Sequence, residues 1–242
     1  MTKKIKIYVL CYDDHSQDHA LITYKCFEWA SVLRIQSSTK ELENIMYLSW
    51  FEENKDDWCG YDFVGTLSWS ADKKLDLTKL DRFLSSIRDG NLENLTEADK
   101  IQFVPFLDFN ILRYSMIEQT QINHHKFRYI WNTLLKNDYR YDVINSRKIP
   151  FFACNYWMAS PEFLLKYCKF QKSIKRKIDE NEELLHINSD SGYVGKISKE
   201  RLIEIFGVPY YTYHPFVYER LIGFFLHVNR RLFVNKTTVR NA

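Results

Sequence analysis

The chain has 242 residues, of which 45% are hydrophobic and 27% are charged, and this composition excludes a disordered or fibrous protein. The formal net charge is only +3, so no large positive field arises and no nucleic-acid partner is predicted. No apolar run approaches the length of a membrane span, and the first residues lack the apolar core of a signal peptide, which predicts a cytoplasmic protein without a transmembrane segment.

The first predicted strand covers Lys4–Cys11, a run that alternates and then becomes continuously apolar. This pattern is typical of a strand that enters the interior of a sheet. Tyr12 and Asp13 follow it directly in a polar, acid-rich loop. An aromatic ring can stack on a base and a carboxylate can accept from a ribose hydroxyl, so this loop is a candidate nucleotide contact.

The sequence contains neither a glycine-rich phosphate-binding motif nor a cysteine motif for zinc. With seven glycines the chain contains neither Gly-x-Gly-x-x-Gly nor a Walker A motif, so dinucleotide-binding dehydrogenases and P-loop kinases are excluded. The five cysteines are scattered without a Cys-x-x-Cys pair. Their pattern indicates reduced thiols in a cytosolic compartment and no zinc site.

The next segments alternate between helix and strand. A helix is expected near Asp18–Ala30, followed by a strand at Val32–Gln36. Ser38 and Glu41 form a capping-box pattern, which predicts that another helix starts there.

The stretch Tyr61–Asp76 carries the strongest functional signal in the first half. Its β-branched, aromatic and aliphatic residues predict a central strand up to Trp69. The polar residues just past that strand include Asp72, Lys73 and Lys74, at the position where open α/β sheets place ligands. A carboxylate beside two lysines suits a metal-bound diphosphate, although a solvated turn has the same composition.

Two more elements complete the first half. A helix is expected from Thr78, with Asp81 as its capping partner, to the residue before Gly90, and a strand at Ile101–Leu107 leads to Asp108. The resulting alternation predicts a single α/β domain over residues 1–242 with a mainly parallel central sheet flanked by helices.

The second half begins with a predicted helix at His124–Asn137 and a long apolar run at Lys148–Ala159. Ser160 followed by proline and glutamate is a strong helix start, and this helix is expected to reach about Glu180. An irregular loop is expected at His186–Lys196, because that segment is polar and lacks an apolar period.

The last two predicted helices lie near the end of the chain. The first begins after Ser198 and ends at Phe206 before Gly207, and the second covers Phe216–Asn229.

Three segments of the sequence carry a resemblance to a known family. They read DFVGTLSWSADKK at 62–74, NYWMASPE at 155–162 and FGVPYYTYHPFVYERL at 206–221. In these segments the chain resembles the small GT-A-type glycosyltransferases encoded by large algal DNA viruses of the chlorovirus type, and related bacterial polysaccharide glycosyltransferases. The resemblance implies a GT-A-like fold, with a nucleotide-binding part at about 1–110 and an acceptor and sugar part at about 111–242.

The resemblance also implies transfer of a sugar from a nucleoside diphosphate donor, usually UDP, with Mn²⁺ or Mg²⁺ on the diphosphate. The family motif Asp-x-Asp corresponds here to Ser70-Ala71-Asp72, so only its last acid is present. Asp72 is then the expected metal ligand, with Lys73 or Lys74 sharing the negative charge. His214 is the expected second metal or phosphate contact.

Further roles follow from the same resemblance. Tyr12 and Asp13 are assigned to the uridine. Asp190 is the first candidate for the base that deprotonates an acceptor hydroxyl and Asp108 the second, and a retaining reaction would need no such base. The substrate-binding candidates are Trp69, Asn155, Trp157, Glu219 and Arg220. A core position for Trp157 and a structural ion pair between Glu219 and Arg220 are the competing interpretations.

The implied partners are a UDP-sugar donor and a glycan or glycoprotein acceptor, for example a viral capsid protein or a surface polysaccharide. The expected location is the cytoplasm, that of the host if the protein is viral. The alternative is a catalytically inactive nucleotide-sugar or glycan-binding module of the same fold, which the missing first acid of the motif favours.

Overall fold

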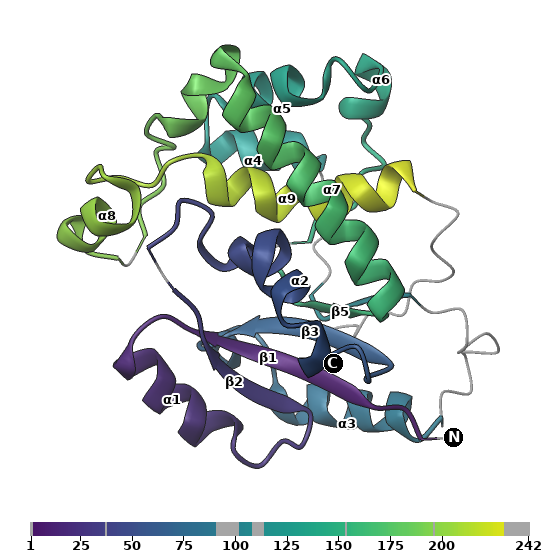
Figure 1. The fold of residues 1–242 in the computed structure, drawn as a ribbon. Coiled ribbons are helices and arrows are strands. Elements are labelled where there is room, and N and C mark those ends of the chain that lie inside the picture. The colour runs from purple at the N-terminus through teal and green to yellow at the C-terminus, as the bar shows by residue number, and fades with distance from the viewer. Residues whose placement is uncertain are drawn as a thin grey trace.

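Five strands in the described part of the chain form one mixed sheet (Figure 1). The computed structural model describes residues 2–36, 38–90, 102–107, 114–152, 154–195 and 197–229. The strands are β1 (Ile5–Cys11), β2 (Ala30–Arg34), β3 (Phe63–Ser68), β4 (Phe103–Pro105) and β5 (Trp157–Ala159), in the spatial order β2-β1-β3-β5-β4.

The direction of the strands corrects the prediction of a mainly parallel sheet. β1 pairs in parallel with β2 and with β3, whereas β5 pairs antiparallel with both β3 and β4. The sheet is mixed because the last strand in the sequence enters between β3 and β4 from the opposite end. The predicted α/β class with helices on both faces is confirmed.

Helices α1 (Asp14–Tyr24) and α3 (Leu77–Arg88) cover one face of the sheet (Figure 1). The alternating residues Ile7, Val9 and Cys11 of β1 pack on this face together with Leu80 and Leu84 of α3. Side chains of a strand point to opposite faces in turn, so the residues between them pack on the other face. This alternation fixes the register of the central strand.

The opposite face carries the larger core. The segment between β2 and β3 crosses it as a 3-10 turn η1 (Leu42–Asn44), a π-helical segment η2 (Met46–Trp50), the short helix α2 (Phe51–Glu53) and a second 3-10 turn η3 (Lys55–Asp57). Tyr8 and Leu10 of β1 join the cluster on this face, which also includes buried residues of the long helices α7 (Pro161–Glu180) and α9 (His214–Val228).

The remaining described helices lie above this second face (Figure 1). They are α4 (Met116–Asn123), α5 (Phe127–Leu135), α6 (Tyr141–Ile144), the 3-10 segment η6 (Glu182–Asn188) and α8 (Lys199–Phe206). None of the helices that the structure describes is long and apolar enough to cross a lipid bilayer.

Several predicted helix ends are confirmed by their capping contacts. The Ser160 side chain accepts from the backbone N–H of Phe163 at 3.3 Å, and α7 begins one residue later. Ser198 caps α8, which ends at Gly207 with φ 74°. Such a left-handed residue closes a helix at little cost when it is glycine.

Other predicted helix starts are wrong. The Ser38–Glu41 pattern does not cap a helix, and the chain forms η1 after Glu41 without a side-chain cap. Asp76, two residues before the predicted Thr78, caps α3 through a 3.1 Å bond from the Lys79 N–H. The capping pattern in the sequence therefore predicted the region of α3 but not its first residue. A difference of one or two residues at a helix end is common.

We predict that Gly65→Ala destabilises the protein strongly, because β3 and β5 approach closely at this glycine. A Cβ there would lie 2.3 Å from the Trp157 carbonyl oxygen and 2.8 Å from the Met158 Cβ. Overpacking of this kind costs about 1–3 kcal/mol of unfolding free energy, measurable by urea denaturation. Gly60→Ala is the matched control, since nothing lies within 4 Å of its Cβ position. Equal stability of the two variants would contradict the described pairing of β3 with β5.

Candidate functional site

The sheet contains a topological switch point between β1 and β3. The chain leaves β1 to form α1 and then β2 on one side, and it later returns to form β3 on the other side of β1. The connections on the two sides of β1 run over opposite faces of the sheet. Open α/β sheets bind ligands in the crevice outside the carboxyl ends of the strands at such a point.

We call the side chains gathered there the carboxyl-edge site. It comprises side chains at the end of β3 and just after β1 and β3, those that precede β5, and one glutamate between β2 and β3: Tyr12, Glu43, Ser68, Trp69, Asp72, Lys73, Lys74, Cys154 and Tyr156. Because β5 runs antiparallel to β3, the residues before β5 reach the same edge as the residues after β3.

Asp72 lies in a 3-10 turn, η4 (Ala71–Lys73), directly beyond β3. Its Oδ1 is 3.4 Å from His19 Nε2 of α1, and the two side chains are 27% and 30% exposed. The His19 ring meets the Trp69 ring edge-on at a centroid distance of 5.2 Å, and Lys73 Nζ lies 5.0 Å from the Trp69 ring centroid. The structure thus groups Asp72, Lys73 and Trp69 with His19, and the predicted roles of Asp72, Lys73 and Trp69 toward a metal, a nucleotide and a substrate stay predictions.

Lys74 reaches from the end of β3 to the segment before β5. Its Nζ donates to Cys154 Sγ at 3.0 Å and lies 5.7 Å from the centroid of the Tyr156 ring. Tyr156 is 2% exposed, its hydroxyl bonds to the Ser68 hydroxyl, and burial raises the pKa of its phenol. The ammonium groups of Lys73 and Lys74 belong to exposed side chains, and both are available to an anionic ligand.

Tyr12 and Asp13, predicted to contact a nucleotide, have different surroundings. The Tyr12 hydroxyl donates to Glu43 Oε2 at 3.2 Å, and its half-buried ring lies beside the sheet edge. Asp13 caps α1, accepting from the Ser16 N–H at 2.8 Å, and this bond lowers the pKa of the Asp13 carboxyl. Asp13 therefore has a structural task that the sequence did not reveal, and its role toward uridine stays a prediction.

Backbone strain is concentrated at the carboxyl-edge site. Among the described residues, the non-glycine residues with positive φ are Leu42 at 50°, Cys154 at 69° and Asn155 at 52°. Such conformations cost of order 1 kcal/mol or more each and cluster at ligand sites. Asn155 Nδ2 donates to Asn44 Oδ1 at 3.0 Å, so one buried hydrogen bond joins the two strained segments.

Asn155 and Trp157, predicted to contact substrate, are enclosed by protein. Asn155 is 2% exposed, and its carbonyl accepts from Thr66 Oγ1 at 2.9 Å. Trp157 is 0% exposed and stacks on Tyr47 at a centroid distance of 5.0 Å. The competing interpretation of Trp157 as a core residue describes this position, and substrate contact by Asn155 stays a prediction.

Glu219 and Arg220 fasten α9 to the loop before β5. The Glu219 carboxylate accepts from the Cys154 backbone N–H and from the Arg220 guanidinium. Arg220 is 8% exposed, donates to Thr120 Oγ1 at 3.2 Å and lies 4.9 Å from the Phe151 ring centroid. These contacts make the pair a structural ion pair beside the site, and donor contact by either residue stays a prediction.

His214 opens α9 and is 5% exposed. Its Nε2 lies 3.2 Å from Asn188 Oδ1, and its ring stacks on Tyr218 at a centroid distance of 6.5 Å. Burial lowers the pKa of the imidazole to about 3, so the ring is neutral at pH 7. Of the two residues predicted to contact the metal, His214 therefore contacts Asn188 at the end of η6, whereas Asp72 contacts His19 of α1.

Of the two predicted catalytic bases, Asp190 alone lies among the described residues. Asp190 is exposed, and its Oδ1 accepts from the Gly192 N–H at 2.8 Å in the irregular segment after η6. Asp108 lies outside the described residues.

The donor set for a metal is small. Within residues 2–229 as described, no group of three or more His, Cys, Asp and Glu side chains is placed to hold an ion. Asp72 supplies one carboxylate with an exposed edge, beside His19. This fits a cation of the Mg²⁺ or Mn²⁺ type, which proteins hold through one or two carboxylates when substrate phosphates and water provide the other oxygens.

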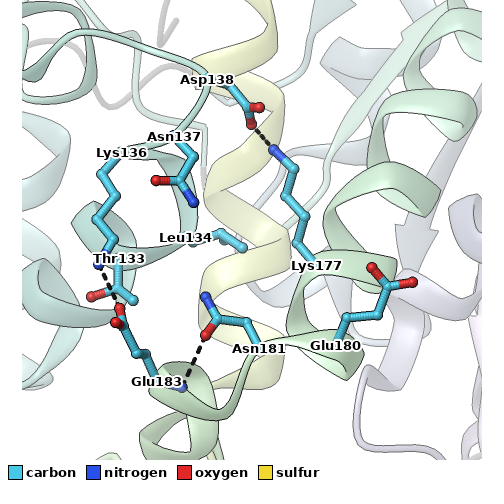
Figure 2. Close-up of a pocket in the computed structure, with 9 residues that line it drawn as sticks. All are labelled: Thr133, Leu134, Lys136, Asn137, Asp138, Lys177, Glu180, Asn181 and Glu183. Carbon is cyan, nitrogen blue, oxygen red and sulfur yellow. Dashed lines mark hydrogen bonds and ion pairs between the residues drawn. The ribbon is translucent and has the colours of Figure 1, made fainter.

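A separate pocket of about 590 Å³ lies between the ends of α5 and α7 (Figure 2). Its lysines face carboxylates, since Lys136 pairs with Glu183 and Lys177 pairs with Asp138. Glu180 adds a third carboxylate to the lining. Three acids against two lysines make this pocket unfavourable for a phosphate, in contrast to the carboxyl-edge site.

Comparison with known proteins gives no family. No protein-family model matches the chain, and neither the curated proteins nor the solved structures include a significant match. The function is therefore argued from the geometry of the carboxyl-edge site.

We predict that Asn44 and Asn155 are energetically coupled. Truncating either one to alanine leaves the buried amide of the other without its partner, at a cost of about 1–3 kcal/mol. The double variant leaves neither amide unpaired, so its loss of unfolding free energy should be smaller than the sum of the two single losses. A double-mutant cycle in urea should therefore give a coupling energy of about 1 kcal/mol. Strictly additive losses would mean that this bond does not hold the two strained segments together.

Proposed function

We propose that the chain is a glycosyltransferase that moves a sugar from a nucleoside diphosphate donor, a UDP-sugar, to a hydroxyl of a glycan or glycoprotein. The observation that carries this proposal is the carboxyl-edge site itself. Two exposed lysines and one carboxylate stand beside aromatic rings at the switch point between β1 and β3. The resemblance of the 62–74, 155–162 and 206–221 segments to GT-A-type transferases supports the same reaction.

The parts of a nucleotide-sugar suit these groups. The Tyr12 ring offers a face or an edge to the base. Lys73 and Lys74 supply positive charge for the diphosphate. Asp72 would hold a Mn²⁺ or Mg²⁺ ion, and such an ion would neutralise the charge of a departing diphosphate.

In the transfer, the acceptor hydroxyl gives its proton to a base or to water and its oxygen bonds to C1 of the sugar, while the bond from C1 to the diphosphate oxygen breaks. The electron pair of that bond leaves with UDP. Lys73 and Lys74 stabilise the negative charge where it develops, and stabilisation of this kind is usually the largest contribution to catalysis.

A non-catalytic nucleotide-sugar or glycan-binding module is the second candidate. The presence of Ser70, where the family pattern has an acid, favours it, because a weaker metal site slows the departure of a diphosphate. The two candidates share the donor site and differ in turnover.

We expect UDP to bind more tightly in the presence of Mn²⁺, as measured by calorimetry. Lys74→Met should weaken UDP binding about tenfold, which is about 1.4 kcal/mol, because a charge that faces the diphosphate is lost. Lys169→Met, at an exposed position of α7, is the matched control and should bind as the wild type does. Failure of UDP to bind with or without Mn²⁺ would remove the proposal.

Turnover separates the enzyme from the binding module. Wild-type protein with Mn²⁺ should release UDP from one or more of UDP-glucose, UDP-galactose and UDP-N-acetylglucosamine. Asp72→Asn should slow this release about a hundredfold, since one donor-site carboxylate is lost. Binding of UDP without release from any of these donors would favour the non-catalytic module.

A further inference from the structure

We propose that Glu43 is the carboxylate that takes the proton from the attacking hydroxyl. This assignment rests on the proposed function and adds a catalytic residue that the sequence did not indicate. Glu43 lies in η1, and it is half-buried at the carboxyl-edge site. A general base must lie within reach of the reacting hydroxyl before its pKa matters.

One oxygen of Glu43 is fixed by its neighbour. The Tyr12 hydroxyl donates to Oε2 at 3.2 Å, and Tyr12 directly follows β1 at the switch point. This contact holds the carboxylate against the edge of the sheet. A carboxylate whose orientation is fixed in this way is preorganised for proton transfer.

The backbone around Glu43 is held rigidly. Leu42, immediately before it, has φ 50°, and Asn44, immediately after it, accepts from Asn155 Nδ2 at 3.0 Å. Both the strain and the buried bond therefore act on the residues adjacent to Glu43. Strain that the surrounding structure maintains is a mark of functional positions, and catalytic groups require this kind of fixed support.

The electrostatic surroundings make Glu43 a stronger base. Burial raises the pKa of the Glu43 carboxyl, while hydrogen bonds from the Glu43 backbone N–H and from Tyr12 and the positive charge of Lys74 oppose that increase. Among the described residues, the negative charge of Glu43 also raises the pKa of phenols on three further segments, Tyr47, Tyr156 and Tyr211. A carboxylate whose pKa is raised accepts a proton more readily than one at its ordinary pKa.

The proton balance of the step is simple. The acceptor O–H bond breaks, and its proton moves to Glu43 as the acceptor oxygen bonds to C1. The bond from C1 to the diphosphate oxygen breaks, and UDP leaves with the electron pair. Glu43 then returns the proton to water, and no oxidant or reductant is involved.

The test compares three variants of the full chain. Glu43→Gln keeps the shape and an acceptor for Tyr12 but cannot take a proton. Glu53→Gln, at an exposed carboxylate at the end of α2, is the matched control. Asp190→Asn removes the carboxylate that the sequence predicts for the same role. UDP binding is measured by calorimetry, and UDP release from the three UDP-sugars is measured from pH 5 to 8, with water as acceptor.

We expect Glu43→Gln to bind UDP within about threefold of the wild type and to release UDP about a hundredfold more slowly, the smaller end of the range for general bases. The wild-type rate should fall as the pH decreases, because protonated Glu43 is inactive, and this fall should disappear in Glu43→Gln. The Glu53→Gln control should keep both the rate and the pH profile.

Other outcomes overturn the assignment in different ways. Full activity in Glu43→Gln with a loss confined to Asp190→Asn refutes Glu43 as the base while leaving the transferase intact. A tenfold weaker UDP affinity in Glu43→Gln would make it a donor-binding residue. Absence of UDP binding to the wild type would remove the proposed function, and the base with it.

Discussion

The antiparallel entry of β5 between β3 and β4 is the constraint on which the site depends. Because β5 runs opposite to β3, its first residues arrive at the edge where β1 and β3 end. Close approach of the two strands is possible because Gly65 has no Cβ to meet the Trp157 carbonyl. A parallel strand in this position would have delivered Cys154 and Tyr156 to the opposite edge, far from Lys74.

Two strained segments, one at Leu42 and one at Cys154 and Asn155, flank the site. The bond between Asn44 and Asn155 joins the turn that carries Glu43 to the loop that carries Cys154. Glu219 of α9 holds the same loop through the Cys154 N–H. The second half of the chain thus supports the candidate site largely through backbone and amide contacts, while the charged groups for a diphosphate come from the first half. The residues proposed to contact the diphosphate are therefore different from the residues that hold the neighbouring segments in place.

Local signals in the sequence predicted much of the frame. The apolar runs located β1 and β3, and the Ser160 and Ser198 caps located α7 and α8. The polar turn after β3 was correctly placed at the end of a central strand, because both features depend on residues close in sequence.

Features that depend on distant contacts could not be predicted. The direction of β5 is not encoded in three apolar residues, so a mixed sheet was mistaken for a mainly parallel one. Asn44 and Asn155 are 111 positions apart, and a positive φ at Leu42 leaves no mark in composition. The capping pattern of Ser38 and Glu41 predicts a regular helix, whereas the segment forms η1 without a side-chain cap, so the contact of Glu43 with Tyr12 could not be predicted.

A crystal structure with UDP and Mn²⁺ tests the central claim most directly, that the carboxyl-edge site binds a nucleotide. The account predicts the diphosphate between the carboxyl ends of β1 and β3, with an oxygen within hydrogen-bond distance of Lys73 or Lys74 Nζ and the ion on Asp72. A nucleotide bound instead in the pocket between α5 and α7, or on any face that leaves Asp72 and both lysines without contact, would contradict it.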